Sequence, residues 1–315
     1  MKHDRICVIG GGGFVGHHLV SLLASRGCRV WVPTRRRSRI IDLTVLPTVE
    51  VVEADVHDPA ALRQLFRGMD AVINLVGILH GTPAEFERAH VELPRKIVQA
   101  CSETDVGRLL HMSALGADAA SRSVYQQTKA KGEAEVMAIG RASDVAVTAF
   151  RPSVIFGPGD SFLSLFADLL KLAPVVPLAG AAARFQPVYV GDVARAFAQA
   201  LNDTSTHDLV YNLCGPTVYT LADLLRLTAR TLGLKRWIIP LDQTQSYLFA
   251  RLMELKPGRK LMTRDNYYAM QTDNVCPEGF PALFGKPTAL EAVIDYLHGS
   301  GPRRGYELLR AMARR

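Results

Sequence analysis

Tyr125 and Lys129 stand four residues apart in the segment SVYQQTKAKGE, a spacing that puts both side chains on one face of a predicted helix. A free phenol has a pKa of about 10 and is a poor acid–base group at neutral pH. A nearby ammonium favours the phenolate, so we expect Lys129 to bring the pKa of Tyr125 toward neutrality. Ser113, at the end of the run LLHMS, could hydrogen-bond the same substrate oxygen as Tyr125. These residues predict a Ser–Tyr–Lys site for hydride transfer.

Residues 6–19 read ICVIGGGGFVGHHL, an apolar run followed by a glycine-rich turn and a helix-period segment. Two spacings overlap in it, Gly10-x-x-Gly13-x-x-Gly16 and Gly11-x-Gly13-x-x-Gly16. Glycines between a strand and a helix allow a tight turn, bring backbone N–H groups against a pyrophosphate and direct the helix N-terminus at its charge. We therefore predict a dinucleotide site contacted by Gly10, Gly11, Gly12, Gly13, Phe14, Val15 and Gly16.

The segment after the second predicted strand, VWVPTRRRSR, bears on which nicotinamide dinucleotide is bound. NAD-selective folds usually place Asp or Glu here to bind the ribose 2′-hydroxyl. This chain has Arg35 and Arg36 instead, and a guanidinium can bind a 2′-phosphate through two hydrogen bonds. We predict that the cofactor is NADP(H) in preference to NAD(H), with at least one of the adjacent arginines solvated.

Further cofactor contacts are expected where other strands end, because ligands of such sheets bind at the carboxyl edge. Asp55 and Val56 follow the third predicted strand and could flank an adenine. Leu75, Val76 and Gly77 end the fourth, where small residues let a cofactor approach the backbone. The expected set is completed by Tyr125, Lys129, Pro152 and Val154.

No motif in the chain indicates a metal site. The sequence has no H-E-x-x-H, no paired histidines at ligand spacing and no Asp/Glu cluster, so no metal is expected. His17 and His18 adjoin the glycine turn but face different ways on a helix. His90, in AEFERAHVELPRK, is interpreted as a buried or capping histidine.

Short β-branched runs alternate with longer helix-period segments in the first half, the pattern of βαβ units. Strands are predicted at Arg5–Ile9, Arg29–Val32, Glu50–Glu53, Ala71–Leu75, Leu109–Met112 and Val145–Phe150. Two more, Gln186–Val190 and Leu209–Leu213, each precede a helix-like segment, so the chain is expected to return to the first sheet more than once. The fold class is α/β, a Rossmann-type doubly wound parallel sheet with a smaller C-terminal substrate domain.

The domain division is expected near residue 155. Residues 1–155 would form the NAD(P)-binding Rossmann domain, with return elements at about 186–232. Residues 156–315 would form a smaller, discontinuous region for substrate or interaction. The basic end PRRGYELLRAMARR, residues 302–315, is interpreted as a solvated helix face or a contact with a membrane or partner.

Composition and charge limit the class of protein. The 315 residues are 48% hydrophobic and 21% charged, which is ordinary for a globular protein. The formal charge of +7 suits an anionic ligand, an acidic partner or a membrane surface; we expect no nucleic-acid partner. The most apolar long stretch, residues 163–183, contains two charges and two prolines and is a poor membrane span. The N-terminal apolar run is too brief for a signal peptide.

Cysteine usage favours a reducing compartment. The five cysteines lie far apart and form no C-x-x-C pair, which argues against a disulfide framework or a structural zinc site; they are Cys7, Cys28, Cys101, Cys214 and Cys276. We expect a cytoplasmic protein, or one peripheral to the inner face of a membrane through lipid or protein-complex contacts. The oligomeric state and the small-molecule substrate are not predicted.

These motifs resemble the short-chain dehydrogenase/reductase superfamily, in its extended and atypical branches, over about residues 5–235. GGGGFVGHHL resembles its glycine turn, and YQQTK its active-site helix. RPSVIFGPGD resembles the strand and loop that open the substrate domain, and QPVYVGDVARA the segment that returns to the cofactor domain. The resemblance implies NADPH binding through Gly10, Gly13, Gly16 and Arg35. It also implies a catalytic role for Ser113, Tyr125 and Lys129, which stand at the matching positions.

Within that superfamily, VINLVGIL, Phe86-x-x-x-His90 and HMSALGAD before SVYQQTKAKGE are most similar to the branch containing the nucleotide-binding accessory subunit of respiratory complex I. Bacterial members of that branch are described as NAD(P)-binding or epimerase/dehydratase-like. The resemblance to the complex I subunit implies a cofactor with a structural role. Sugar-nucleotide epimerases differ from this chain, which has NLVG after the fourth strand and Ser113-Ala114 after the fifth.

Three functional hypotheses remain open at this point. The first is an NADP(H)-dependent oxidoreductase of a small or hydrophobic carbonyl or alcohol, in keeping with the apolar segment FLSLFADLLKLAPVVPLAG. The second is a non-catalytic NADPH-binding accessory or assembly protein of a respiratory or quinone-related complex. The third is a nucleotide-sugar epimerase or dehydratase with bound NAD.

Overall fold

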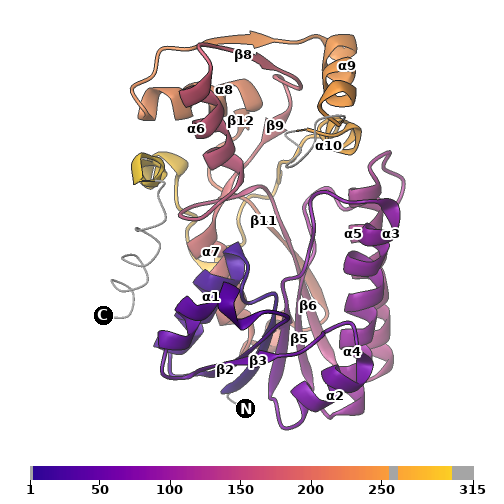
Figure 1. The fold of residues 1–315 in the computed structure, drawn as a ribbon. Helices are drawn as coiled ribbons and strands as arrows, with labels where there is room; N and C mark the ends of the chain where they lie inside the picture. Colours follow the sequence, from indigo (N-terminus) through magenta and orange to yellow (C-terminus); the bar gives the residue numbers. More distant parts are fainter. Residues whose placement is uncertain (1–2, 255–261, 300–315) are drawn as a thin grey trace.

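The computed structural model describes residues 3–254 and 262–299, and its centre is a seven-stranded, wholly parallel sheet (Figure 1). The strand order is β11-β6-β5-β4-β1-β2-β3. The strands are β1 Arg5–Ile9, β2 Arg29–Thr34, β3 Val49–Glu53, β4 Ala71–Asn74, β5 Arg108–Met112, β6 Ala146–Pro152 and β11 Leu209–Leu213. The basic segment 302–315 lies outside the described residues.

Helices cover both faces of this sheet, as alternate side chains of β1 demonstrate. Ile6 and Val8 pack into one core with α1 (Phe14–Ser25) and α7 (Val190–Ala200). Cys7 and Ile9 pack into a second core with α2 (Pro59–Phe66), α4 (Leu93–Glu103) and α5 (Val124–Ala142). Both faces of the strands are therefore buried, which explains their continuous apolar sequence. The predicted Rossmann-type doubly wound sheet is confirmed.

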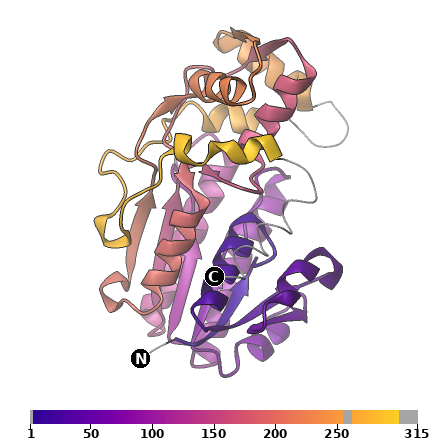
Figure 2. The same cartoon turned by 90° about the vertical axis from the view of Figure 1, so that its left-hand side faces the viewer.

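A smaller region lies beyond the carboxyl ends of the strands (Figures 1 and 2). Its core joins α6 (Phe162–Leu172) and α8 (Leu221–Thr231) to the two-stranded parallel sheet of β8 (Val175–Leu178) and β13 (Trp237–Pro240). Helices α9 (Gln243–Glu254) and α10 (Arg264–Ala269) adjoin it. The smaller region thus approaches the carboxyl edge of the large sheet.

The sequence prediction of repeated return to the first sheet is only half right. Leu209–Leu213 does enter it, as β11 beside β6. The predicted strand Gln186–Val190 shortens to β10 (Val188–Tyr189) and pairs with β7 (Ile155–Phe156) outside the large sheet. The backbone of Gln186 instead bonds Asn274 and Gly215, so the chain here is tied to the C-terminal segment. A second short pair, β9 (Arg184–Phe185) with β12 (Tyr219–Thr220), lies nearby.

The expectation of no disulfide was wrong for one pair, since Cys214 and Cys276 are joined. Cys214 directly follows β11, and the C-terminal segment passes the same point, where the Cys276 N–H donates to Gln186 Oε1 over 2.8 Å. The two cysteines are 62 residues apart in sequence. The tertiary fold brings the two cysteines together, and their spacing in the sequence could not predict the bond.

Among the described residues, no helix is long and apolar enough to cross a membrane. The apolar stretch 163–183 folds instead into most of α6 and all of β8. Within residues 3–254 and 262–299 no group of three His, Cys, Asp or Glu side chains gathers at metal-binding distance.

Candidate functional site

The glycine turn joins β1 to α1 at the carboxyl edge of the sheet. Gly10 has a φ of +83°, which an L side chain rarely adopts. The Gly13 N–H donates to Gly10 O over 2.9 Å, and α1 starts at the next residue. A Cβ on Gly16 would lie 2.4 Å from Gly10 O, so only glycine lets α1 approach the turn this closely. The tight turn that phosphate binding requires is therefore built.

The remaining residues of the glycine turn differ in how closely their neighbours enclose them. A Cβ on Gly12 would lie 2.4 Å from Ile40 Cγ2, and one on Gly11 2.8 Å from Val32 Cγ1, so neighbours enclose both glycines. Phe14 is half-buried, whereas the Val15 side chain packs into the core. Helix α1 has no side chain capping its N-terminus.

Arg35 and Arg36 directly follow β2 and are both exposed. The Arg36 N–H donates to Thr34 Oγ1 over 3.2 Å. Burial lowers the pKa of His57, and Arg88 and Arg35 lower it further. His57 lies in the segment after β3, so the Arg35 charge acts on that segment.

Asp55 and Val56 lie in that segment after β3. Asp55 is exposed and accepts the His57 N–H over 3.0 Å, while Val56 is half-buried. An Asx-type turn of this kind fixes the backbone and leaves one carboxylate oxygen for another partner.

The segment Leu75–Val76–Gly77 connects the glycine turn to Lys129. Strand β4 ends at Asn74, whose Oδ1 accepts the Val76 N–H over 3.1 Å. A Cβ on Gly10 would lie 3.2 Å from Val76 N, and one on Gly77 3.1 Å from Lys129 Nζ. The end of β4 therefore touches the glycine turn on one side and Lys129 of α5 on the other.

Ser113 and Lys129 meet at the end of β5. The Ser113 N–H donates to Phe150 O over 2.7 Å, while its Oγ is buried and has no hydrogen-bond partner among the described residues. The Lys129 Nζ is buried and donates to Met112 O over 3.1 Å. An unpartnered buried hydroxyl is costly, and a bound ligand would satisfy it.

Tyr125 precedes Lys129 by one turn of α5 and is half-buried. Its ring packs edge-on against His90, with centroids 5.4 Å apart, and against Phe86 at 6.1 Å. Burial raises the pKa of Tyr125 to about 12, and the Asp265 carboxylate adds to the rise. Burial lowers the pKa of Lys129 to about 8, against an opposing effect of Glu133. The expected fall in the pKa of Tyr125 was wrong, because burial and the Asp265 carboxylate raise it.

His90 is a site residue whose position the sequence did not reveal. It is buried, as expected, in a π-helical turn (Arg88–Glu92) that packs on α5, where a Cβ on Gly132 would overlap His90 O. The Ile78 N–H donates to its Nε2 over 3.0 Å, so Nδ1 carries the proton and faces Thr128 Oγ1 at 3.0 Å. Burial and then Lys129 lower the pKa of His90 to about 3.

His111 is a second unpredicted neighbour of Lys129. Its Nδ1 lies 3.2 Å from Asn74 Nδ2, and the use of Asn74 Oδ1 by Val76 makes that amide the donor. Burial, Lys129 and His90 together lower the pKa of His111 to about 3. Both histidines are therefore neutral, and Lys129 is the cation among these three buried groups.

Pro152 and Val154 flank the end of β6. Pro152 O accepts the Leu115 N–H over 2.9 Å, and Val154 O accepts the Val188 N–H over 2.9 Å. Their carbonyls are thus engaged within the protein, and Val154 packs partly on the core of the smaller region.

The C-terminal segment reaches back to this edge of the sheet. Asp265, at the start of α10, accepts the Val124 N–H over 2.6 Å and the Ser123 hydroxyl over 2.9 Å, and so caps α5. Asn274 Nδ2 donates to Leu115 O over 3.1 Å, and the Ser153 hydroxyl donates to Asn274 Oδ1 over 2.6 Å. Sequence reasoning assigned no role to this segment.

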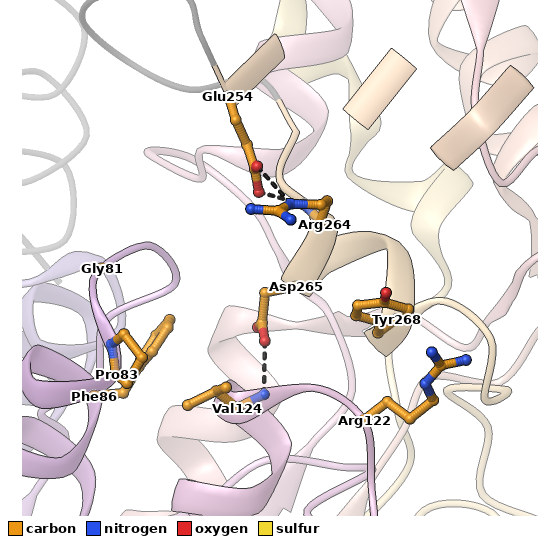
Figure 3. Close-up of a pocket in the computed structure, with 9 residues that line it drawn as sticks. All are labelled: Gly81, Pro83, Phe86, Arg122, Val124, Glu254, Arg264, Asp265 and Tyr268. Carbon is orange, nitrogen blue, oxygen red and sulfur yellow. Dashed lines mark hydrogen bonds and ion pairs between the residues drawn. The ribbon is translucent and has the colours of Figure 1, made fainter. Parts of the chain in front are cut away.

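A cavity of about 230 Å³ opens beside the start of α5 (Figure 3). Pro83, Phe86 and Val124 give it an apolar wall. On the opposite side the Arg122 guanidinium lies 4.5 Å from the centre of the Tyr268 ring, and Arg264, paired with Glu254, closes the rim. Because Phe86 also touches the Tyr125 ring, the cavity adjoins the predicted acid–base residue.

The model of the NAD dependent epimerase/dehydratase family matches residues 6–214, from β1 to the residue after β11. The chain belongs to this family. The match covers the glycine turn, the segment after β4 and the helix with Tyr125 and Lys129. The chain is therefore assigned to an NAD(P)-binding oxidoreductase family with a Rossmann-type fold.

Curated relatives carry two kinds of name. The 40 kDa subunit of NADH-ubiquinone oxidoreductase from Neurospora crassa is 31% identical over 73% of this chain and 60% of that protein. Subunit 9 of the NADH dehydrogenase [ubiquinone] 1 alpha subcomplex of mouse is 31% identical over 90% of this chain and 77% of its own length. The ceramide reductase of Caulobacter vibrioides is 27% identical over 94% of this chain and 95% of that protein.

Solved structures share the fold. The UDP-glucose 4-epimerase of Thermotoga maritima superposes with a TM-score of 0.73 at 19% identity, over 93% of this chain and 96% of that one. This likeness extends the shared architecture through the smaller C-terminal region.

Proposed function

We propose that the protein is an NADP(H)-dependent reductase of a hydrophobic carbonyl compound, with Ser113, Tyr125 and Lys129 as its catalytic residues. The observation that carries the proposal is the pairing at the end of β5. There a buried, unpartnered Ser113 hydroxyl and the buried Lys129 ammonium lie at the sheet edge that also carries the glycine turn. Such groups are costly unless a ligand engages them.

The residues at this edge fit a nicotinamide dinucleotide. The uncapped N-terminus of α1 and the turn through Gly10, Gly13 and Gly16 suit a pyrophosphate. Arg35, with Arg36 beside it, suits a 2′-phosphate, and Gly77 leaves room next to Lys129. When bound, the nicotinamide would supply the hydride.

The protonation state of Tyr125 favours the reductive direction. With a pKa of about 12, its phenol keeps the proton at neutral pH and can donate it to a carbonyl oxygen that is becoming an alkoxide. The Ser113 hydroxyl would hydrogen-bond the same oxygen. The Lys129 ammonium, with a pKa of about 8, would stabilise the negative charge that develops there.

The substrate is proposed to carry an apolar chain. The wall of Pro83, Phe86 and Val124 leads to the Tyr125 ring, so an alkyl chain could lie in the cavity with its carbonyl at the hydroxyl. The relative that this chain matches nearly end to end is named a ceramide reductase, which supports a long-chain substrate.

The proposal is tested by NADPH oxidation with a panel of long-chain ketones, medium-chain aldehydes and short-chain ketones. We expect turnover to rise with chain length and to fall by about a hundredfold or more in Tyr125→Phe, as loss of an acid–base group predicts. Turnover unchanged in Tyr125→Phe, or no oxidation by any member of the panel, would refute it.

The cofactor preference is tested separately with Arg35→Ala and Arg36→Ala. Binding of NADPH and of NADH is measured by calorimetry for each variant. We expect NADPH to bind more tightly than NADH to the unmodified protein, and at least one variant to lose about tenfold for NADPH alone. Equal affinities in the unmodified protein would refute the assignment of the arginines.

A second candidate follows from the names of the Neurospora and mouse relatives, both subunits of a respiratory oxidoreductase. We infer from them that the same fold could hold NADPH without turnover, as an accessory part of a larger assembly. Cofactor that survives purification, as identified by mass spectrometry, and that no carbonyl in the panel oxidises would favour this function over the first.

A further inference from the structure

An exposed apolar face occupies the two-stranded sheet of β8 and β13, away from the proposed active site. The strands pair in parallel with Trp237 beside Val175 and Ile239 beside Pro177. Val176, Leu178 and Ile238 pack in or against the core of the smaller region. Alternation therefore turns Val175, Pro177, Trp237 and Ile239 outward. Trp237 is 77% exposed, and Val175 and Ile239 are each nearly half exposed.

Leu172 extends this face at the end of α6 and is 85% exposed. Two residues separate it from β8. The Trp237 N–H donates to Pro174 O over 2.9 Å, so the end of α6 lies beside the start of β13. Isolated exposed leucines are common, but five neighbouring apolar side chains with a tryptophan are typical of an interaction surface. We call Leu172, Val175, Pro177, Trp237 and Ile239 the β8–β13 face.

Basic side chains gather at one end of the β8–β13 face. Lys171 and Lys235 are exposed beside Leu172 and Trp237. The Arg236 Nε donates to Leu170 O over 2.6 Å, which holds this guanidinium against the end of α6. The acidic residues on the same elements lie farther along them, Asp168 a turn back in α6 and Asp242 beyond β13.

We propose that the β8–β13 face binds the surface of an anionic phospholipid bilayer. Tryptophan and aliphatic side chains partition into the bilayer interface, and neighbouring Lys and Arg are attracted by anionic headgroups. A second copy of the chain fits less well, because its β8–β13 face carries the same basic side chains and so offers them no opposite charge. Figures 1 and 2 place β8 and α9 at the end of the molecule far from the N-terminus. This proposal is independent of the proposed function.

The chain carries its own probe, because Trp237 is one of two tryptophans. In Trp31→Phe, the fluorescence reports Trp237 alone. Mixing that variant with vesicles of phosphatidylglycerol and phosphatidylcholine is expected to shift the emission to the blue and to allow quenching by brominated acyl chains. Pure phosphatidylcholine vesicles should give a much smaller change. Emission that stays unshifted and unquenched with the anionic vesicles would overturn the proposal.

Cosedimentation of the full-length protein with the same vesicles tests the two components of the β8–β13 face. Trp237→Ser with Ile239→Ser removes apolar groups, and Lys171→Glu with Lys235→Glu reverses charges; each pair is expected to weaken binding about tenfold or more. Val45→Ser and Arg67→Glu are matched controls, exposed and outside this face, and should bind like the unmodified protein. Thermal unfolding verifies that each variant is folded.

Two further outcomes would overturn the proposal. Binding that survives both double substitutions would place the membrane contact elsewhere, for example in the basic residues 302–315. A stable dimer without vesicles that Trp237→Ser converts to a monomer would show that a second copy covers the face.

Discussion

Two helices start at the same edge of the sheet, and they differ in whether side chains cap the free N–H groups of their first turn. Helix α1 starts after Gly13 with no capping side chain. Helix α5 is capped by Ser123 and by Asp265, a carboxylate from 141 residues away. The first helix start is open and suits an anionic ligand, whereas the second is closed by the protein's own charge. We therefore expect the start of α1 to bind an anionic ligand and the start of α5 to hold Tyr125 in place.

The largest effect is expected from breaking the open helix start. In Gly16→Ala the added Cβ would lie 2.4 Å from Gly10 O and 2.5 Å from Gly11 O, and backbone atoms cannot move aside cheaply. We expect a loss of about 1–3 kcal/mol in the free energy of unfolding, together with loss of NADPH binding. Thermal unfolding with and without NADPH measures both.

The control for that variant is Gly107→Ala, where an added Cβ meets nothing within 4 Å. It should change stability by less than about 0.5 kcal/mol and keep the NADPH-induced rise in Tm. A Gly16→Ala protein with the same NADPH-induced rise would contradict the close packing of α1 on the turn.

The closed helix start is broken by Asp265→Ala. Loss of the cap should cost about 1 kcal/mol of stability, and loss of the carboxylate should lower the pKa of Tyr125, since Asp265 contributes to its rise. Asp265→Asn keeps the size and removes only the charge, so it should retain more stability but show the same fall in pKa. Thermal unfolding and the pH profile of NADPH oxidation measure the two effects.

Asp223→Ala provides the matched control, because Asp223 completes a capping box with Thr220 at the start of α8, outside the site. It should lose similar stability without changing the pH profile. A pH profile in Asp265→Asn that coincides with that of the unmodified protein would show that Asp265 is only a structural cap.

The pH dependence of carbonyl reduction should show a smaller effect, in which the contribution of the Lys129 charge is distinguished from that of the Tyr125 proton. Because burial lowers the pKa of Lys129 to about 8, its ammonium is lost as the pH rises through that value, while the phenol of Tyr125 stays protonated until about 12. We expect kcat/KM for carbonyl reduction to decline above about pH 8, by about tenfold per unit. In Lys129→Arg the charge persists, so the profile should be flatter even if the rate is lower. A decline that persists in Lys129→Arg would assign it to another group.

The same contrast explains which features could be predicted from the sequence. The glycine turn occupies one strand–turn–helix unit, so consecutive residues suffice to predict it. Tyr125 and Lys129 are four residues apart, so their spacing alone predicts that they share one helix face. The alternation of strands and helices likewise predicted six neighbouring strands of the sheet. Each of these features depends on residues close together in the chain.

The features that could not be predicted from the sequence depend on contacts between residues far apart in the chain. Asp265 reaches α5 from the far end of the chain, and its charge, with burial, reverses the expected shift in the pKa of Tyr125. The Cys214–Cys276 bond depends on the path of the C-terminal segment, as does the diversion of residues 186–190 from the large sheet. His90 and His111 approach Lys129 only because the ends of three elements converge.

The central claim is that Tyr125 donates the proton during carbonyl reduction. The most direct measurement is single-turnover oxidation of bound NADPH by the best ketone of the panel, in the unmodified protein and in Tyr125→Phe. We predict the same NADPH affinity and a rate lowered by about a hundredfold to ten-thousandfold in the variant. Equal single-turnover rates in the two proteins would contradict the account.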